Sequence, residues 1–151
     1  MQVQSAFAVC EPDTGAAACA DLFQNLTDPF YIQENAALTQ TLGWLDAFTS
    51  QPSAYAVLAQ SSADVAAAVN FAREHHVRLV VKGGGHSYLG TSNAPDSLLI
   101  WTRPNMATVE IHGSFVPQGA TGRVAPEAAV SVGAGAIWMD AYNAATVVTA
   151  L

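Results

Sequence analysis

The chain is poor in charged residues and poorest in basic ones. Only 11% of its 151 residues are Asp, Glu, Lys or Arg, and twelve acidic side chains outnumber five basic ones, so the net charge is −7 at pH 7. Recognition of nucleic acid requires a basic patch, and adsorption to an anionic membrane surface requires the same. We therefore expect neither nucleic acid nor membrane as a partner, and no apolar run approaches the length of a transmembrane helix.

Cysteine is also scarce. Cys10 and Cys19 are the only two in the chain, and no histidine or acidic pair stands at metal-ligand spacing beside them, so we predict no zinc or other metal site. The turn-prone segment Glu11–Gly15 between them would allow a short disulfide loop. Two interpretations stay open: a disulfide of an exported protein, or two free thiols in a loose arm.

The chain shows no recognisable export signal. Ala6-Phe7-Ala8 resembles a small-residue cleavage site, but neither a basic segment nor an apolar segment precedes it. Asn25-Leu26-Thr27 matches the pattern of an N-glycosylation site. We predict a secreted or periplasmic location, with any signal peptide already removed.

Glycine is concentrated in one informative run, Lys82-Gly83-Gly84-Gly85-His86-Ser87, directly after the apolar strand expected over Val77–Val81. Glycines here let successive backbone N–H groups turn towards a phosphate without obstruction by Cβ atoms, forming an anion-binding nest. His86 places an imidazole at the mouth of that nest, where a cofactor ring can lie. The alternative is a surface turn with an inert histidine. The candidate ligand-binding residues of this loop are Lys82, Gly83, Gly84, Gly85, His86, Ser87, Gly90 and Ser92.

A strand–helix–strand unit positions this loop. Tyr55–Ala59 predicts a short strand, and Ser61-Ser62-Ala63-Asp64 resembles a capping box before a helix that carries Val65, Val69 and Ala72 at helical spacing. Such a unit predicts parallel strands with a right-handed crossover. The loop then leaves the carboxyl end of the second strand, where ligands usually bind.

Two phosphate-binding motifs almost fit the sequence. Gly85–Ser92 has the spacing of a Walker A loop, but Thr91 stands where a lysine must reach the terminal phosphates, which argues against nucleotide hydrolysis. Gly133-Ala134-Gly135 follows a strand and opens a helix, but Trp138 occupies the third glycine position of a dinucleotide fingerprint, where a large indole would hold helix and strand apart. Gly133 and Gly135 are therefore expected to serve a phosphate-bearing ligand in another way, or to shape a turn.

The remaining segments are less specific. Leucines at helical spacing predict a helix over Asn35–Ala47, and Gly113–Pro126 indicates a hairpin-like excursion between two strands. Arg103 and Arg123 are isolated, and we expect them to be solvated rather than bound to a phosphate.

Three runs, Pro52–Val57, Ser61–Val69 and Arg78–Ser92, together resemble the N-terminal FAD-binding subdomain of flavin-linked oxidases of the p-cresol methylhydroxylase (PCMH) or vanillyl-alcohol oxidase type. The berberine bridge enzyme-like branch is most similar. In that branch a basic or polar residue and then Gly-Gly-His-Ser mark the loop that binds the FAD pyrophosphate, and the histidine bonds to the flavin 8α-methyl carbon. The matching positions here are Lys82, Gly84, Gly85, His86 and Ser87. Gly133 to Trp138 is similar to the family's next flavin-side segment.

The resemblance implies FAD as cofactor, attached covalently through His86, whose neutral imidazole is a nucleophile. It also implies that Lys82 assists the pyrophosphate or a developing negative charge as a point charge. Many members of the branch carry a second link through a later cysteine, which neither Cys10 nor Cys19 can supply. The family's substrate domain and catalytic base have no counterpart in these residues, so the catalytic residues stay unassigned.

We therefore predict an α+β fold, a PCMH-type FAD-binding subdomain with a strand–helix–strand unit and a small mixed sheet that later sequence completes. Residues 1–27 are expected to form an N-terminal arm, and residues 28–151 the first part of the domain, truncated at its C-terminal end. The whole protein would oxidise an alcohol, sugar or phenolic substrate with oxygen as acceptor, whereas this fragment alone would be inactive. The alternative is a non-catalytic module that binds a nucleotide or another anion through the glycine-rich loop.

Overall fold

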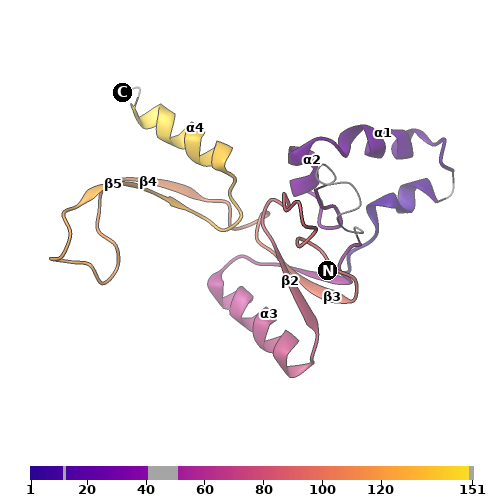
Figure 1. The fold of residues 1–151 in the computed structure, drawn as a ribbon, viewed down its shortest axis with the longest axis horizontal. Helices are drawn as coiled ribbons and strands as arrows, with labels where there is room; N and C mark the ends of the chain where they lie inside the picture. Colours follow the sequence, from indigo (N-terminus) through magenta and orange to yellow (C-terminus); the bar gives the residue numbers. More distant parts are fainter. Residues whose placement is uncertain (12, 41–50, 150–151) are drawn as a thin grey trace.

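The computed structural model describes residues 1–11, 13–40 and 51–149. Its centre is a three-stranded parallel sheet with the strand order β1 (Tyr55–Leu58), β3 (Ser97–Trp101), β2 (Arg78–Lys82). The helix α3 (Ser62–Glu74) connects β1 to β2 (Figure 1). The predicted strand–helix–strand unit with parallel strands is confirmed, and a third strand lies between the two predicted ones.

This central strand, β3, is buried along its whole length. Leu99 and Ile100 are 0% exposed, and they pack on opposite faces of the sheet. Leu99 belongs to an apolar cluster with Val80, whereas Ile100 belongs to one with Ala68 of α3. The strand is absent from the sequence-based prediction, although Leu98–Trp101 is a short continuous apolar run, the pattern of a central strand in a parallel sheet.

The helix α3 begins at a capping box, as predicted. The Ser61 hydroxyl oxygen accepts a hydrogen bond from the Asp64 N–H (3.3 Å), and the Asp64 carboxylate accepts one from the Gln60 N–H (2.9 Å). The reciprocal bond thus reaches one residue further upstream than in the usual capping box. The Gln60 N–H and then the Ser61 hydroxyl lower the pKa of Asp64.

Three short helices precede the sheet: the 3₁₀-helix η1 (Ala6–Cys10), α1 (Ala17–Asn25) and α2 (Pro29–Gln33). Cys10 and Cys19 form a disulfide with their Cα atoms 4.9 Å apart, so the bridged interpretation of the two cysteines holds. Leu22, Ile32 and Leu38 form a small apolar core beneath these helices. The N-terminal part is therefore held together by one covalent bond and its own apolar contacts.

The helix predicted over Asn35–Ala47 is wrong in its described part. Residues 35–40 follow α2 as a turn and irregular chain, and the rest of the predicted helix lies outside the described residues. The carbonyl oxygens of Asn35 and Leu38 accept hydrogen bonds from the Lys82 side chain instead of from helical N–H groups. A tertiary contact therefore overrides the local helical pattern.

The C-terminal part is an antiparallel hairpin of β4 (Val109–Phe115) and β5 (Glu127–Val132), followed by α4 (Trp138–Thr149). Figure 1 shows the hairpin and α4 extending away from the parallel sheet. The predicted hairpin is confirmed, with β4 continuing to Phe115 beyond an irregularity in the pairing after His112. The α+β class is confirmed as well, as two small sheets, one parallel and one antiparallel.

Gly133 and Gly135 bring the chain after β5 against the turn Thr102–Met106. The Gly135 N–H donates to the Met106 carbonyl oxygen (2.8 Å). A Cβ atom at Gly133 would collide with the Met106 carbonyl oxygen, and one at Gly135 would collide with the Thr102 carbonyl oxygen. Both glycines are therefore needed for the close approach of two backbone segments.

We predict that Gly135→Ala destabilises the protein by about 1–3 kcal/mol, the usual range for overpacking, because the new methyl group must displace the Thr102 carbonyl group. Gly113→Ala is the matched control, since a Cβ atom at Gly113 meets nothing within 4 Å. Urea titration gives the free energy of unfolding of both variants. Equal stability of the two variants would contradict the close packing of this segment.

Candidate functional site

The glycine-rich loop leaves the carboxyl end of β2, as predicted. Gly85 has a φ of +76°, which glycine adopts without strain. No described residue accepts a hydrogen bond from five consecutive backbone N–H groups, those of Gly83, Gly84, Gly85, His86 and Ser87. Consecutive unpaired donors next to a residue in the left-handed region are the arrangement of an anion-binding nest.

The end of the loop is a compact turn. The Ser87 hydroxyl oxygen accepts hydrogen bonds from the Thr91 hydroxyl (2.8 Å) and the Leu89 N–H (3.3 Å). Gly90, with a φ of +68°, lies inside this turn, and Ser92 is buried just after it. The structure gives Ser87 and Gly90 a role in shaping the loop, while a contact of Ser87, Gly90 or Ser92 with a ligand stays a prediction.

Lys82 is the single lysine of the chain, and it lies buried beneath the loop at 1% exposure. Its Nζ donates to the carbonyl oxygens of Asn35 (2.5 Å), Leu38 (2.6 Å) and Ile32 (3.3 Å). The centroid of the Trp101 ring lies 5.7 Å from the same nitrogen, within cation–π range. Three acceptors match the three N–H groups of an ammonium ion.

Burial of the Lys82 side chain changes its pKa and leaves no space for a side chain at Gly85. Burial lowers the pKa of Lys82 to about 8, while the charge of Glu34 acts in the opposite direction. A Cβ atom at Gly85 would lie 2.5 Å from Lys82 Cε, so Gly85 is needed for this packing as well as for its φ. Contact between Lys82 and a phosphate stays a prediction.

His86 lies on the exposed side of the loop and contacts the start of α2. Its Nε2 is 3.1 Å from the Pro29 carbonyl oxygen. A carbonyl oxygen only accepts, so this hydrogen bond requires the proton on Nε2 and leaves the lone pair of the neutral ring on Nδ1. The neighbouring Gly85 carbonyl oxygen accepts a hydrogen bond from the Gln40 N–H (3.1 Å). The segment Pro29–Gln40 therefore holds two successive residues of the loop.

The glycine-rich loop and the segment after β5 line one cavity of about 290 Å³. Gly84 and His86 come from the loop, and the other lining residues are Val132, Ala136, Ile137 and Trp138. The structure thus brings together the two glycine-containing segments that the sequence singled out. Gly133 and Gly135 do not line the cavity, and their N–H groups donate to backbone carbonyl groups, so the structure gives them a packing role, while their contact with a ligand stays a prediction.

The expectation that Arg103 is solvated is wrong. Its side chain is 15% exposed and forms ion pairs with Glu34 (2.8 Å) and Asp140 (2.9 Å). Asp140 also accepts a hydrogen bond from the Ile137 N–H (3.2 Å), and this bond, followed by the Arg103 guanidinium, holds the pKa of Asp140 below its usual value. No short-range pattern signals this cluster, because Arg103 lies 69 residues from Glu34 and 37 from Asp140.

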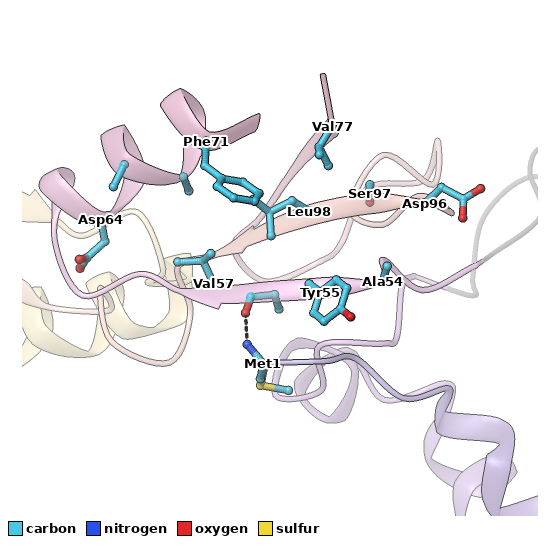
Figure 2. Close-up of a pocket in the computed structure, with 13 residues that line it drawn as sticks. Met1, Ala54, Tyr55, Val57, Asp64, Phe71, Val77, Asp96, Ser97 and Leu98 are labelled. Atoms are coloured by element: carbon cyan, nitrogen blue, oxygen red, sulfur yellow. Dashed lines mark hydrogen bonds between the residues drawn. The ribbon is translucent and has the colours of Figure 1, made fainter. Parts of the chain in front are cut away.

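A larger cavity, of about 870 Å³, lies between α3 and the neighbouring sheet, away from the loop. Figure 2 shows Phe71, Val57 and Leu98 around it, with Asp64 and Asp96 at its ends. Its lining is almost entirely apolar and carries no group of converging donors. The smaller cavity beside the loop is therefore the better candidate for a ligand with a phosphate.

Two other kinds of feature are not found in the parts of the chain that the structure describes. In residues 1–11, 13–40 and 51–149, no three His, Cys, Asp or Glu side chains come together as a metal site would require. Within the same ranges, no helix combines the length and the apolar composition needed to cross a membrane.

Known proteins share this sequence pattern. FAD-linked oxidoreductase easE of Claviceps fusiformis is 31% identical over 149 residues, which cover 84% of this chain and 25% of that protein. FAD-linked oxidoreductase penH of Penicillium thymicola is 41% identical over 88 residues, which cover 58% of this chain and 15% of that protein. The chain thus spans a quarter or less of the length of these two relatives.

The fold also has a counterpart among solved structures. The VAO-type flavoprotein MtVAO615 from Myceliophthora thermophila C1 superposes with a TM-score of 0.79 at 24% sequence identity, over 98% of this chain and 29% of the other. The sequence matches the FAD binding domain family over residues 52–147, which include both segments that line the smaller cavity. Because this match extends over more than half of its residues, the chain belongs to the FAD binding domain family, and it has the fold of the VAO-type flavoproteins.

Proposed function

We propose that the loop Gly83–Ser87 binds the pyrophosphate of FAD, and that the complete protein is an oxidase of an alcohol, sugar or phenolic substrate with oxygen as electron acceptor. The observation that carries the proposal is the row of five unpaired backbone N–H groups beside the cavity of about 290 Å³. These donors fit a diphosphate without any cationic side chain. When bound, FAD supplies the two-electron redox chemistry, and the protein supplies position and electrostatics.

We also propose a branch of the family for this chain and a complete protein that is longer than these 151 residues. The Gly-Gly-His-Ser run, residues 84–87, favours the berberine bridge enzyme-like branch. Since the relatives are several times longer, we place the substrate pocket, the catalytic base and any second flavin-linked cysteine in sequence beyond these 151 residues. The chain itself then contributes the pyrophosphate loop and one wall of the flavin site.

We further propose that His86 is the covalent anchor of the flavin. The hydrogen bond to the Pro29 carbonyl oxygen keeps the proton on Nε2, so Nδ1 is the nitrogen that carries the lone pair in the neutral ring. Nδ1 is therefore the atom we assign to the bond with the 8α-methyl carbon. A methyl C–H bond would break as this bond forms: the proton would leave to solvent, and the electron pair would pass through the flavin to oxygen, the proposed acceptor. Exposure of His86 and its place in the lining of the smaller cavity support this assignment.

Two features of the N-terminal part support an exported location for the protein. Disulfides such as Cys10–Cys19 are typical of proteins in oxidising compartments. The sequon Asn25-Leu26-Thr27 lies at the end of α1, with Asn25 partly exposed and Thr27 exposed. We propose that the protein is exported through a secretory route.

The pyrophosphate loop is tested by Gly84→Val in the full-length protein. A Cβ atom at Gly84 points at the His86 ring (3.4 Å) and Ile137 (3.5 Å), so the larger side chain fills the cavity. We expect FAD to be lost on desalting, measured by visible absorbance, while Gly113→Val on the open hairpin retains it. Normal flavin content in Gly84→Val would overturn the assignment of the loop.

The covalent anchor is tested by acid denaturation of the full-length protein. We expect the flavin to stay with the precipitated chain, and the tryptic peptide containing His86 to carry the mass of the flavin. His86→Ala should release the flavin, or should leave only the part bonded to a later cysteine, whereas His75→Ala at the exposed end of α3 should change nothing. A His86 peptide without flavin in freshly purified protein would refute the anchor.

Export is tested by expression of the full-length protein in a eukaryotic secretory host. We expect enzymatic removal of N-glycans to lower the mass of the peptide that contains Asn25. Thr27→Ala should abolish that change, and Thr27→Ser should preserve it because the sequon persists. An unglycosylated Asn25 in secreted wild-type protein would show that this sequon is not used and gives no support for export.

A further inference from the structure

The segment Pro29–Gln40 is the common support of the glycine-rich loop. From below, the Lys82 ammonium group binds three of its carbonyl oxygens, and Asn93 Nδ2 binds a fourth, that of Ala36 (2.9 Å). Two further hydrogen bonds join the segment directly to the loop. The Gln40 N–H donates to the Gly85 carbonyl oxygen, and the Pro29 carbonyl oxygen accepts from His86 Nε2. The position of this segment therefore sets the positions of two residues of the loop.

The same segment also holds the opposite lining of the smaller cavity. Glu34 forms an ion pair with Arg103, and Arg103 forms a second ion pair with Asp140 at the start of α4. The Arg103 guanidinium also donates a hydrogen bond to the Gly135 carbonyl oxygen (3.2 Å). Asp140 in turn accepts from the Ile137 N–H. Both linings of the cavity are thus connected to the segment Pro29–Gln40, to which Lys82 donates three hydrogen bonds.

We propose that Lys82 is a positioning residue, whose ammonium group fixes the Pro29–Gln40 turn and through it the His86 ring, in the geometry needed for flavin attachment. This inference rests on the proposed function of the loop. It differs from the direct contact with phosphate expected from the sequence, because the donors of Lys82 are already directed at the carbonyl oxygens of the turn.

Removal of the ammonium group would leave the turn without its main donor. Lys82→Met keeps an unbranched apolar stem beneath Gly85 but leaves three carbonyl oxygens without their donor. The disulfide, Asn93 and the apolar core still hold the surrounding chain, so the turn moves while the domain persists. Small displacements of a reacting group cost large factors in rate, and the displaced atom here is His86 Nδ1.

The first experiment measures covalent flavin in folded full-length protein. Flavin that resists acid precipitation is counted per molecule recovered as a monodisperse, folded fraction, and its rate of attachment to flavin-free protein is followed after addition of FAD. We expect Lys82→Met to lower that rate at least about tenfold. Arg123→Gln, which removes an exposed positive charge, is the control and should match the wild type. A purely structural role predicts fewer folded molecules with a normal rate, and that result would overturn the proposal.

If Lys82→Met does not fold, the attachment rate is measured in Lys82→Gln, because the amide retains two N–H donors for the turn. We expect an attachment rate below that of the wild type. An unchanged rate in folded Lys82→Gln would overturn the proposal in the same way.

The second experiment needs no Lys82 variant. Reductive methylation of folded full-length protein, with and without bound flavin, is followed by mass analysis of the peptide containing residue 82. We expect Lys82 to stay unmodified in both states, because carbonyl oxygens of the chain hold it. Methylation in the flavin-free state alone would show that the cofactor protects Lys82 directly, and methylation in both states would show that the turn does not hold it. Either result overturns the proposal.

The Gly84→Val variant distinguishes failure of the proposed FAD-binding role of the loop from failure of the proposed role of Lys82. Normal flavin content in Gly84→Val refutes the function proposed for the loop. Loss of flavin in Gly84→Val together with a normal attachment rate in Lys82→Met refutes the inference about Lys82 alone.

Discussion

One buried positive charge organises the part of the chain that carries the glycine-rich loop. An ammonium group is very costly to bury unless its donors are satisfied, and Lys82 meets that condition with three backbone carbonyl oxygens and the face of Trp101. The need to satisfy these donors constrains the chain on two sides of Lys82. It forces residues 35–40 out of a helical conformation, and it leaves room for no side chain at Gly85. The shape of the loop is therefore a consequence of how this charge is accommodated.

In this site, backbone groups are available to a ligand, whereas most of the charged side chains form contacts within the chain. Groups available to a ligand are mainly backbone N–H donors of residues 83–87, together with the imidazole of His86. The ionic side chains nearby, Lys82 and the Glu34–Arg103–Asp140 cluster, are occupied with contacts inside the chain. A diphosphate can be held by such a loop without a free cation, which agrees with the chain's membership of an FAD binding domain family and with its acidic composition.

Local patterns predicted what depends on neighbouring residues. The unit from Tyr55 to Lys82, its capping box and the C-terminal hairpin follow from periodicity and turn chemistry. The apolar run of β3 is the pattern of a central strand, but periodicity alone does not distinguish such a short run from a buried helical segment. The burial of Lys82 and the ion pairs of Arg103 could not be predicted from local patterns, because their partners are 37 to 69 residues away. The partners of Lys82 also lie in a turn whose leucine spacing indicates a helix.

The place of β3 between two strands that precede it has a consequence for how the polypeptide acquires its structure. When β1, α3 and β2 have been synthesised, the two strands are not partners, and each must leave a space of one strand, so that they end about 10 Å apart. Neither finds its hydrogen-bond ladder until Ser97–Trp101 arrives. Nascent chains that end before that point carry two unpaired strand edges and an exposed apolar helix face. The parallel sheet can therefore form only once β3, which is buried along its whole length, has been synthesised.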